Sequence, residues 1–393
     1  MVLHAPPRTS SAPQPVGPAP RRFAQAGIGT AVGLVLLGVL LLVALGVVGL
    51  TVGVDAMPAA TVLALIPLAG VMGAVLWFDR WEREPWPALA TAFGWGASVA
   101  VLIALVLNTG AQFFLMVAGA TETDAAVFGA TVVAPVVEES AKAAGVLLIF
   151  FVWRRTFDGP VDGLVYGATV GAGFAFVENI LYFGRTMAES AALQDDGTSV
   201  AMVFLLRAVM SPFAHLMFTC CTGLALGFAA RRRWRQAWVL ALPVGLGLAM
   251  VLHGLWNGSA TVNSQSGFFT VYLLVQVPLF AAAVALALAV RHHEAGVVRT
   301  RLTEYAAAGW LAPVEVVMLS SLRERRRARG WASARGGASA GRAMRDFQLA
   351  ASRLAHQRER LVRRPDADAL LDERLVLGEL TGARSRLMAT VSG

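Results

Sequence analysis

Long runs of apolar residues dominate the chain, and polar residues gather in short segments between these runs. A transmembrane helix needs about 20 consecutive, predominantly apolar residues. Segments of that length recur along the first three quarters of the sequence. The predicted spans are residues 27–54, 57–78, 87–118, 126–152, 161–183, 200–230, 236–258 and 268–290. The pattern predicts an all-α, polytopic membrane helix bundle of about eight transmembrane helices.

The composition agrees with this interpretation. Hydrophobic residues make up 56% of the 393 residues and charged residues only 15%, and the mean hydropathy is positive. Soluble globular domains typically contain about 25% charged residues. The chain therefore does not have the composition of a typical soluble globular protein.

Arginine is divided unevenly among the loops between the predicted spans. Arg80 and Arg83 follow the second span, two more arginines follow the fourth, and four lie between residues 231 and 235 after the sixth. The alternate loops contain Arg185 as their only basic residue. Because positively charged loops stay in the cytoplasm, we predict a multi-pass protein of the plasma membrane with both termini cytoplasmic.

The two ends of the chain differ from its apolar middle. Residues 1–25 are rich in Pro, Ala and Ser, which predicts a disordered N-terminal segment. Residues 291–393 contain 19 Arg and 11 acidic residues, a balance of +8. We therefore predict an eight-span membrane domain over residues 26–290, followed by a basic, partly helical cytoplasmic tail over residues 291–393.

One segment of the tail has a helical pattern. Met344, Phe347, Ala351, Leu354 and Leu361 follow a spacing of three or four residues, which predicts an amphipathic helix. This helix could be solvated, could lie on anionic lipid at the membrane surface or could dock a partner protein. Residues 333–341, "SARGGASAG", predict a flexible joint. No nucleic-acid motif is present, and we expect no nucleic-acid partner.

The fourth predicted span breaks the apolar pattern. Residues 132–151, "VVAPVVEESAKAAGVLLIFF", carry Glu138, Glu139 and Lys142 near the middle. Unpaired in lipid, three ionisable side chains would together cost about 8 kcal/mol, so they must face a protein interior or a water-filled cavity. A helix-packing ion pair would explain Glu138 and Lys142, four residues apart on one helix face. It would leave Glu139 without a role.

Three later spans hold further polar side chains. Glu178 and Asn179 lie among apolar residues of the fifth span, His215 lies in the sixth, and His253 and Asn257 lie one turn apart in the seventh. At a rise of 1.5 Å per residue, these side chains and the acid pair reach comparable depths in the outer half of the bilayer. We predict that they converge on one cavity.

The residue types indicate a catalytic metal site. Two imidazoles and a carboxylate are the ligands of many catalytic zinc sites, which leave a fourth position for water. The predicted zinc ligands are Glu178, His215 and His253. A metal-free version, in which a glutamate activates the water and the histidines stabilise charge, is also consistent with these residues.

The remaining polar side chains predict the parts of a hydrolytic reaction. The predicted catalytic residues are Glu138, Glu139, Lys142, Asn179 and Asn257. One of the two glutamates would be the general base, and the lysine would hold one of them ionised. One of the two asparagines would donate a hydrogen bond to the developing oxyanion.

Two further patterns predict packing rather than chemistry. Gly163, Gly167 and Gly171 recur every four residues, so a neighbouring helix can approach the fifth span closely. The loop "DRWEREP", residues 79–85, predicts a structural Arg–Glu clamp at the membrane surface.

Five segments together resemble the PrsW intramembrane proteases, relatives of the CAAX prenyl endopeptidases and of the abortive-infection membrane proteases. The segments are "DRWEREP" (79–85), "APVVEESAK" (134–142), "DGLVYGATVGAGFAFVEN" (162–179), "RAVMSPFAHLMFTCCTG" (207–223) and "HGLWN" (253–257). They follow the family's order across the second to seventh spans. The resemblance does not extend to the N-terminal segment or to the tail.

The resemblance implies hydrolysis of a peptide bond within or beside the bilayer. Family members look like site-one proteases that clip membrane-anchored anti-sigma factors on their extracytoplasmic side, so a membrane-anchored protein is the expected substrate and the bilayer the expected surroundings. The family's functional residues correspond to Glu138, Glu139, Phe174, Glu178, His215 and His253. Zinc is often assumed for the family, whereas the CAAX-type relatives are similar to a metal-free design.

Two other classes of protein stay open. An ion- or proton-coupled transporter also carries ionisable residues at depth, but transporters typically show two related halves with broken helices. Here the polar residues cluster in the fourth to seventh spans, and the other spans show nothing comparable. A non-catalytic membrane scaffold is the second alternative, and the presence of every candidate acid and imidazole argues against it.

Overall fold

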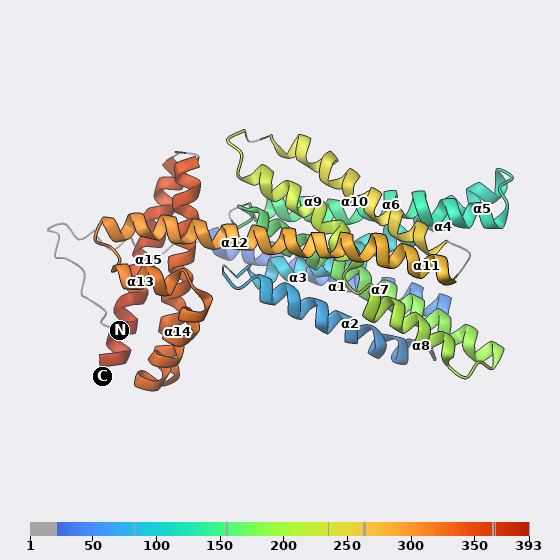
Figure 1. Cartoon of the computed structure of the whole chain (residues 1–393), viewed down its shortest axis with the longest axis horizontal. Helices are drawn as coiled ribbons and strands as arrows, with labels where there is room; N and C mark the ends of the chain where they lie inside the picture. Colours follow the sequence, from blue (N-terminus) through green and yellow to red (C-terminus); the bar gives the residue numbers. More distant parts are fainter. Residues whose placement is uncertain are drawn as a thin grey trace. The chain divides into compact units, whose positions relative to one another are not determined.

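The computed structural model describes residues 22–81, 83–154, 156–234, 236–261, 265–363, 365 and 367–392. These residues form helices and no strand, which confirms the predicted all-α, polytopic bundle (Figure 1). The predicted disordered segment lies outside the described residues up to Arg21. Its last four residues already belong to helix α1, which begins at Arg22.

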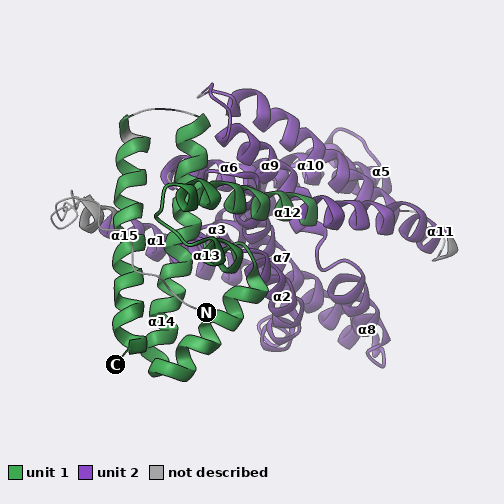
Figure 2. Ribbon diagram, turned by 60° about the vertical axis from the view of Figure 1, so that its left-hand side comes forward, with its two compact units in different colours: residues 1–21, 80–83, 288–393 green, residues 22–79, 84–287 purple. Residues whose placement is uncertain are grey.

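The chain divides into two compact units (Figure 2). Unit 2 comprises residues 22–79 and 84–287, and unit 1 includes residues 80–83 and 288–393. The helices of unit 2 up to the start of α12 are α1 (Arg22–Val52), α2 (Met57–Phe78), α3 (Trp86–Trp95), η1 (Gly96–Ala100), α4 (Val101–Val117), α5 (Glu122–Phe128), η2 (Gly129–Val133), α6 (Ala134–Val152), α7 (Pro160–Leu193), α8 (Thr198–Phe204), η3 (Leu205–Met210), α9 (Ala214–Ala230), α10 (Trp238–Ala260), α11 (Gln265–Val271) and η4 (Tyr272–Gln276). Helix α12 (Val277–Ala307) runs on into unit 1, which continues with α13 (Pro313–Leu319), α14 (Leu322–Arg363) and α15 (Ala367–Ser392).

Seven helical segments of the described chain are long and apolar enough to cross a membrane. They are residues 27–52, 57–78, 86–117, 160–193, 198–230, 238–260 and 267–307, and each overlaps a predicted span. The remaining predicted span is the fourth, residues 126–152. It lies within the continuous helix α5–η2–α6 and carries three charged residues, so its place in the bilayer stays a prediction. Helix α7 continues ten residues beyond the predicted end of the fifth span at residue 183, to Leu193.

Helix α7 is the centre of unit 2. It packs against α1, α2, α3, α6, α8 and α9, and Figure 1 shows the helices of this unit lying alongside one another. The predicted glycine face of α7 packs against α9: a Cβ on Gly163 would overlap the carbonyl oxygen of Gly223, and a Cβ on Gly171 would lie 2.7 Å from that of His215. These glycines therefore let the two backbones touch, which brings His215 close to α7.

Short π-helical segments interrupt four of the long helices in the described chain. Such segments insert an extra residue into a helical turn and are frequent at functional sites. Two of them, η2 and η3, border the cavity described below. They change which side chains share a helix face, so a spacing of four residues no longer predicts a common face across them.

The loop between α2 and α3 is closed by a carboxylate. Both oxygens of Asp79 accept the backbone N–H of Glu84, at 3.2 and 3.1 Å, and the Glu84 carboxylate accepts the hydroxyl of Tyr166 on α7. Burial, reinforced by the charge of Asp162, raises the pKa of the Glu84 carboxyl well above its usual range. Glu84 thus contacts the Asp79 side chain through its backbone N–H and Tyr166 through its carboxylate. The predicted Arg–Glu clamp stays a prediction, since Glu82 lies outside the described residues.

Unit 1 has a hydrophobic core of its own. The first four residues of the predicted apolar stripe of α14, Met344 to Leu354, are buried in this core, whereas Leu361 is half-buried. The buried part of the stripe therefore faces neither lipid nor a partner protein, contrary to the prediction from the sequence. The predicted joint at residues 333–341 is helical apart from Gly336 and Gly337, where α14 kinks; Gly337 has φ +66° and ψ −161°.

The contact between α7 and α9 predicts a selective sensitivity to added methyl groups. We expect Gly163→Ala to lower the free energy of unfolding by about 1–3 kcal/mol, because the backbones must separate to accept the Cβ. Gly247→Ala, on α10, is the control, since nothing lies within 4 Å of its added Cβ. Thermal unfolding of the purified protein in detergent measures both, and equal stability of the two variants would contradict the packing described here.

Candidate active site

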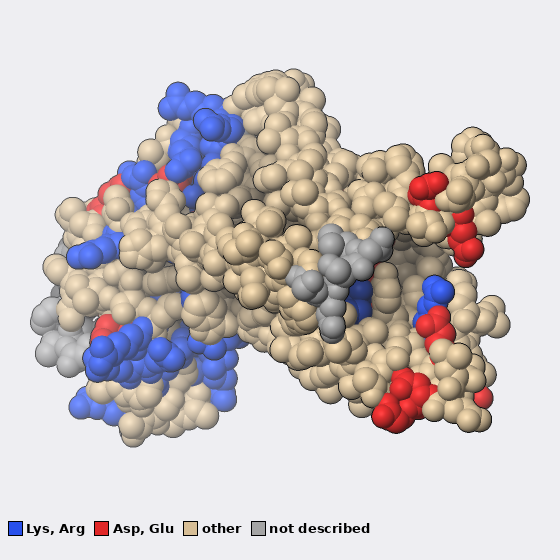
Figure 3. All heavy atoms as spheres, turned by 45° about the vertical axis from the view of Figure 1, so that its right-hand side comes forward, with Lys and Arg blue, Asp and Glu red and all other residues tan. Residues whose placement is uncertain are grey.

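A cavity of about 520 Å³ lies between the helices of unit 2. Figure 3 shows a hollow in the surface of this unit with acidic side chains around it. The lining includes five of the predicted residues: Glu138, Glu178, Asn179, His215 and Asn257. The structure thus brings these side chains, from α6, α7, α9 and α10, to one place.

A buried ammonium group connects the polar side chains behind the lining. Nζ of Lys142, the chain's only lysine, lies 2.8 Å from Glu139 Oε1, 3.4 Å from Glu138 Oε2 and 3.1 Å from His215 Nδ1. It also lies 3.8 Å from the centre of the Phe174 ring. The lysine side chain is fully buried, and a buried charge is tolerated only when it is paired and hydrogen-bonded. Lys142 therefore links α6 to both α7 and α9.

Glu139 is enclosed by donors. Its carboxylate accepts hydrogen bonds from Lys142 and from Thr219 Oγ1 at 3.3 Å, and its Oε1 lies 2.9 Å from His253 Nδ1. Only 1% of its side chain is exposed. Because a carboxylate accepts, Nδ1 of His253 carries a proton directed at Glu139. Glu139 thus fixes the orientation and tautomer of His253.

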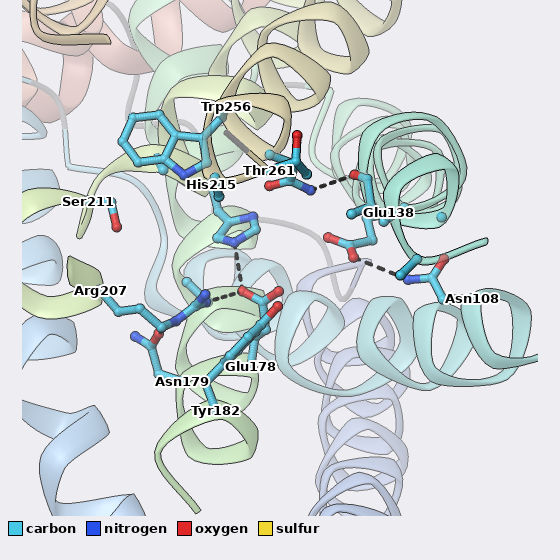
Figure 4. A pocket seen from close by; sticks show the side chains of 18 of the residues that line it. Asn108, Glu138, Glu178, Asn179, Tyr182, Arg207, Ser211, His215, Trp256 and Thr261 are labelled. Carbon is cyan, nitrogen blue, oxygen red and sulfur yellow. Dashed lines mark hydrogen bonds and ion pairs between the residues drawn. The ribbon is translucent and has the colours of Figure 1, made fainter. Parts of the chain in front are cut away.

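Glu138 is the member of the acid pair that borders the cavity (Figure 4). Its Oε1 accepts a hydrogen bond from Asn108 Nδ2 at 3.2 Å, and its Oε2 lies 3.9 Å from His253 Nε2. Asn108 comes from α4, a part of the chain where the sequence predicted nothing comparable, and that prediction was wrong. The amides of Asn108 and Gln112 in a mostly apolar span were the available signal.

Glu178 takes its cation from another helix. Arg207, on η3, donates to the Glu178 carboxylate and, through Nε at 2.7 Å, to Asn179 Oδ1. Its guanidinium also lies over the Tyr182 ring, 3.9 Å from the centre. Glu178 Oε2 lies 2.7 Å from His215 Nε2, which places the His215 proton on Nε2 (Figure 4). Arg207 was not among the predicted site residues. It lies on η3, which ends at Met210, and α9 with His215 begins only at Ala214.

The two predicted oxyanion donors, Asn179 and Asn257, both line the cavity, but their amide groups make different hydrogen bonds. Asn179 accepts from Arg207, as described above. Asn257 Nδ2 donates to the carbonyl oxygen of Ala130 on η2, at 2.9 Å. An amide nitrogen carries two protons, so the bond to Ala130 uses one of the two that Asn257 has to offer.

One group of side chains has the composition of a metal site. Ligand atoms of Glu138, His215 and His253 lie within 4.8 Å of one another. Each imidazole has its other nitrogen held by a carboxylate, His215 by Glu178 and His253 by Glu139, which is the usual arrangement around zinc ligands. The donors therefore fit zinc, with Glu138 in the place predicted for Glu178. The Lys142 ammonium contacts two of these three donors.

The fold and the site together define a membrane-embedded enzyme of the hydrolase type. Residues 84–283, just over half of the chain, match the PrsW family intramembrane metalloprotease. The chain belongs to this family and is an intramembrane protease. The match contains all the predicted site residues and ends within α12, so most of unit 1 lies outside it.

Three relatives bear the name Protease PrsW. The one from Geobacillus kaustophilus is 28% identical over 195 residues, which cover 49% of this chain and 75% of the relative. The one from Clostridioides difficile is 29% identical over 198 residues, covering 50% and 76%. The one from Bacillus subtilis is 33% identical over 138 residues, covering 35% and 56%. No solved structure matches the chain significantly.

The buried charges at Lys142 predict a double-mutant effect on stability. Lys142→Met should lower the free energy of unfolding by about 3–5 kcal/mol, because it leaves buried carboxylates without their cation. The double variant Glu139→Gln/Lys142→Met removes the lysine together with the carboxylate at the shorter distance, leaves only Glu138 without its cation, and should regain part of that loss. Thermal unfolding measures this, with Arg185→Met as the control at an exposed ion pair, expected to cost less than about 1 kcal/mol. No recovery in the double variant would mean that the lysine acts through packing alone.

Proposed function

We propose that the chain hydrolyses a peptide bond of a membrane-anchored protein, and that Glu138 activates the attacking water. One observation supports this most directly: Glu138 borders the cavity, while Asn108, Lys142 and His253 surround its carboxylate. Hydrolysis needs water at a depth where lipid excludes it, and the cavity would supply that water. Glu139 lacks this access, so of the predicted pair we assign the general base to Glu138.

The reaction would follow from the contacts of each group. Glu138 takes a proton from water as the water oxygen bonds to the carbonyl carbon of the substrate. The amide of Asn257 donates to the oxyanion that forms. Glu138 then returns the proton to the leaving nitrogen as the C–N bond breaks. Lys142 keeps Glu138 ionised between turnovers, and Glu139 acts as a positioning residue through His253.

Zinc assistance is the metal-dependent version of this proposal. Zinc would be held by Glu138, His215 and His253, and it would lower the pKa of a bound water to about 7. Glu138 would then bind the metal instead of accepting a proton. Glu139 and Glu178 would hold the two imidazoles in the same way in both versions.

The topology of the protease is also part of the proposal. We infer an eight-span domain over residues 26–290, with both termini cytoplasmic and the cavity open to the outside. In support, acidic residues of α5 and of the loop after α7 lie at the cavity end of the bundle (Figure 3), and arginine-rich loops follow the opposite helix ends. A single-pass substrate cleaved on its outer side, such as an anti-sigma factor, would fit this orientation.

Cleavage should depend on the acid and the imidazole at the cavity. We expect Glu138→Gln and His215→Ala each to lower cleavage at least 100-fold, and Glu139→Gln to do so by misplacing His253. Quantitative membrane proteomics of cells with each variant should show one single-pass protein shortened only by the active enzyme. Glu189→Gln is the matched control, because that carboxylate is exposed and pairs with Arg185. Normal cleavage by Glu138→Gln and His215→Ala would rule out this site.

Zinc and the Lys142 ammonium should compete for the same donors. Lys142→Met frees the lone pair of His215 Nδ1 and removes a like charge a few ångströms from the ion, so we expect it to bind zinc at least tenfold more tightly than the wild type. His253→Ala should weaken zinc binding. Titration of purified protein against a zinc chelator of known affinity measures both, below the unfolding temperature of each variant. Equal affinity of wild type and Lys142→Met would show that Lys142 does not occupy the metal position.

A further inference from the structure

Five arginines of unit 1 form one group, which we call the arginine patch. Its members are Arg80, Arg83, Arg326, Arg329 and Arg345. Arg329 is half-buried and the other four are exposed. The strongest charge interactions of Arg329 come from these four, and all are repulsive; burial first, then this repulsion, lowers the pKa of its guanidinium.

A buried arginine outside the patch holds the loop that carries Arg80 and Arg83 against α14, through contacts with uncharged groups. The buried guanidinium of Arg325 lies over the Trp81 ring, 4.9 Å from its centre, and donates to the Trp81 carbonyl oxygen at 3.4 Å. Arg325 also donates to Ser352 Oγ at 2.7 Å. These contacts fix Trp81, which lies between Arg80 and Arg83, against α14. Arg329 itself donates to Gln348 Oε1 at 3.0 Å.

The patch arginines have no acidic partner among the described residues. Several other arginines of this unit do pair with carboxylates. Such pairs are Arg301–Glu359, Arg353–Glu379, Arg358–Glu304, Arg360–Asp372 and Arg384–Glu315. Within the described part of the chain, none of the five patch arginines has a carboxylate oxygen within 4.0 Å. Since these five neighbouring guanidinium groups pair with no described carboxylate, an anion from outside the chain is a candidate partner for them.

The chain connection places the patch at the surface of the bilayer. Arg80 lies two residues beyond Phe78, the end of a candidate membrane span, so it can be at most about 7 Å further along the chain. The lipid headgroup layer is about 5–7 Å thick on each side. Trp77 and Trp86, on either side of this loop, are 43% and 73% exposed, as is typical of tryptophans at the membrane interface.

We propose that the arginine patch binds phosphate groups of anionic lipid headgroups at the end of α2. Guanidinium groups bind phosphate through paired, charge-assisted hydrogen bonds, and headgroups are the phosphates present at that depth. Bound lipid would relieve the repulsion within the patch and hold unit 1 at the membrane surface. Four of the five patch side chains are exposed, and all lie outside the region matched to the protease family.

The experiment compares two double variants with the same loss of charge. Arg326→Gln/Arg345→Gln removes two exposed members of the patch, whereas Arg374→Gln/Arg386→Gln removes two exposed arginines elsewhere in unit 1. Full-length protein in dodecyl maltoside is titrated with phosphatidylglycerol, and native mass spectrometry counts the bound lipids. We expect the patch variant to bind about 30-fold more weakly and the control to bind within about twofold of the wild type. Unchanged thermal unfolding of both variants in lipid-free detergent checks that they fold.

Three outcomes would overturn the inference. Equal weakening in both double variants would mean that net charge alone attracts the lipid. Displacement of phosphatidylglycerol by inorganic phosphate at the same phosphate concentration would identify a soluble anion as the ligand. Tighter binding of a 20-nucleotide single-stranded DNA than of the lipid, lost in the patch variant, would identify a nucleic-acid site.

Discussion

The hydrogen bonds of one buried ammonium group determine the geometry of the site. Lys142 can be charged inside a membrane bundle only because Glu138, Glu139 and the Nδ1 lone pair of His215 surround it. Each of these contacts also fixes its partner, so one side chain sets the positions of two carboxylates and an imidazole. Through Glu139 the same network reaches His253 on α10. Ionic and hydrogen-bonding contacts therefore connect α6, α9 and α10, whereas lipid-facing spans are held by packing alone.

The glycine contact between α7 and α9 sets the remaining distance in the site. Gly171 touches the backbone of His215, and Glu178 lies two turns further along α7. This close approach lets the Glu178 carboxylate reach His215 Nε2 at 2.7 Å. A side chain in place of the glycine would push the helices apart, and the carboxylate would lose the imidazole. A helix contact made by glycines thus contributes to the orientation of the Glu178 carboxylate toward His215.

Much of this arrangement could be predicted because lipid makes polar residues conspicuous. Ionisable side chains in apolar spans must face protein or water, and this rule alone identified Glu138, Glu178, His215 and their neighbours. It could not say which acid would lie closest to both imidazoles, since that depends on helix rotation and on the π-helical segments. It also missed Asn108, because a single neutral amide costs little in a span.

The tail shows a second limit of sequence patterns. A stripe of apolar residues at helical spacing is compatible with lipid, with a partner or with a core, and only the neighbouring helices decide. In unit 1 those neighbours are α12, α13 and α15, which cover the stripe. The pattern correctly predicted that α14 is a helix. It could not predict what covers the apolar face of α14, because that depends on how all the helices of unit 1 fold together.

Charge balance connects the two polar regions of the molecule. With all groups ionised and the imidazoles neutral, the site contains three carboxylates, Glu138, Glu139 and Glu178, and two cations, Lys142 and Arg207. The surplus is one negative charge. Glu178 pairs with Arg207, and Lys142 lies closer to Glu139, at 2.8 Å, than to Glu138, at 3.4 Å, so we assign the surplus to Glu138. A carboxylate with an incompletely compensated charge needs water, a proton or a metal ion, and the cavity offers that access. The arginine patch has the opposite surplus among the described residues, and the lipid phosphates proposed for it would compensate that charge in the same way.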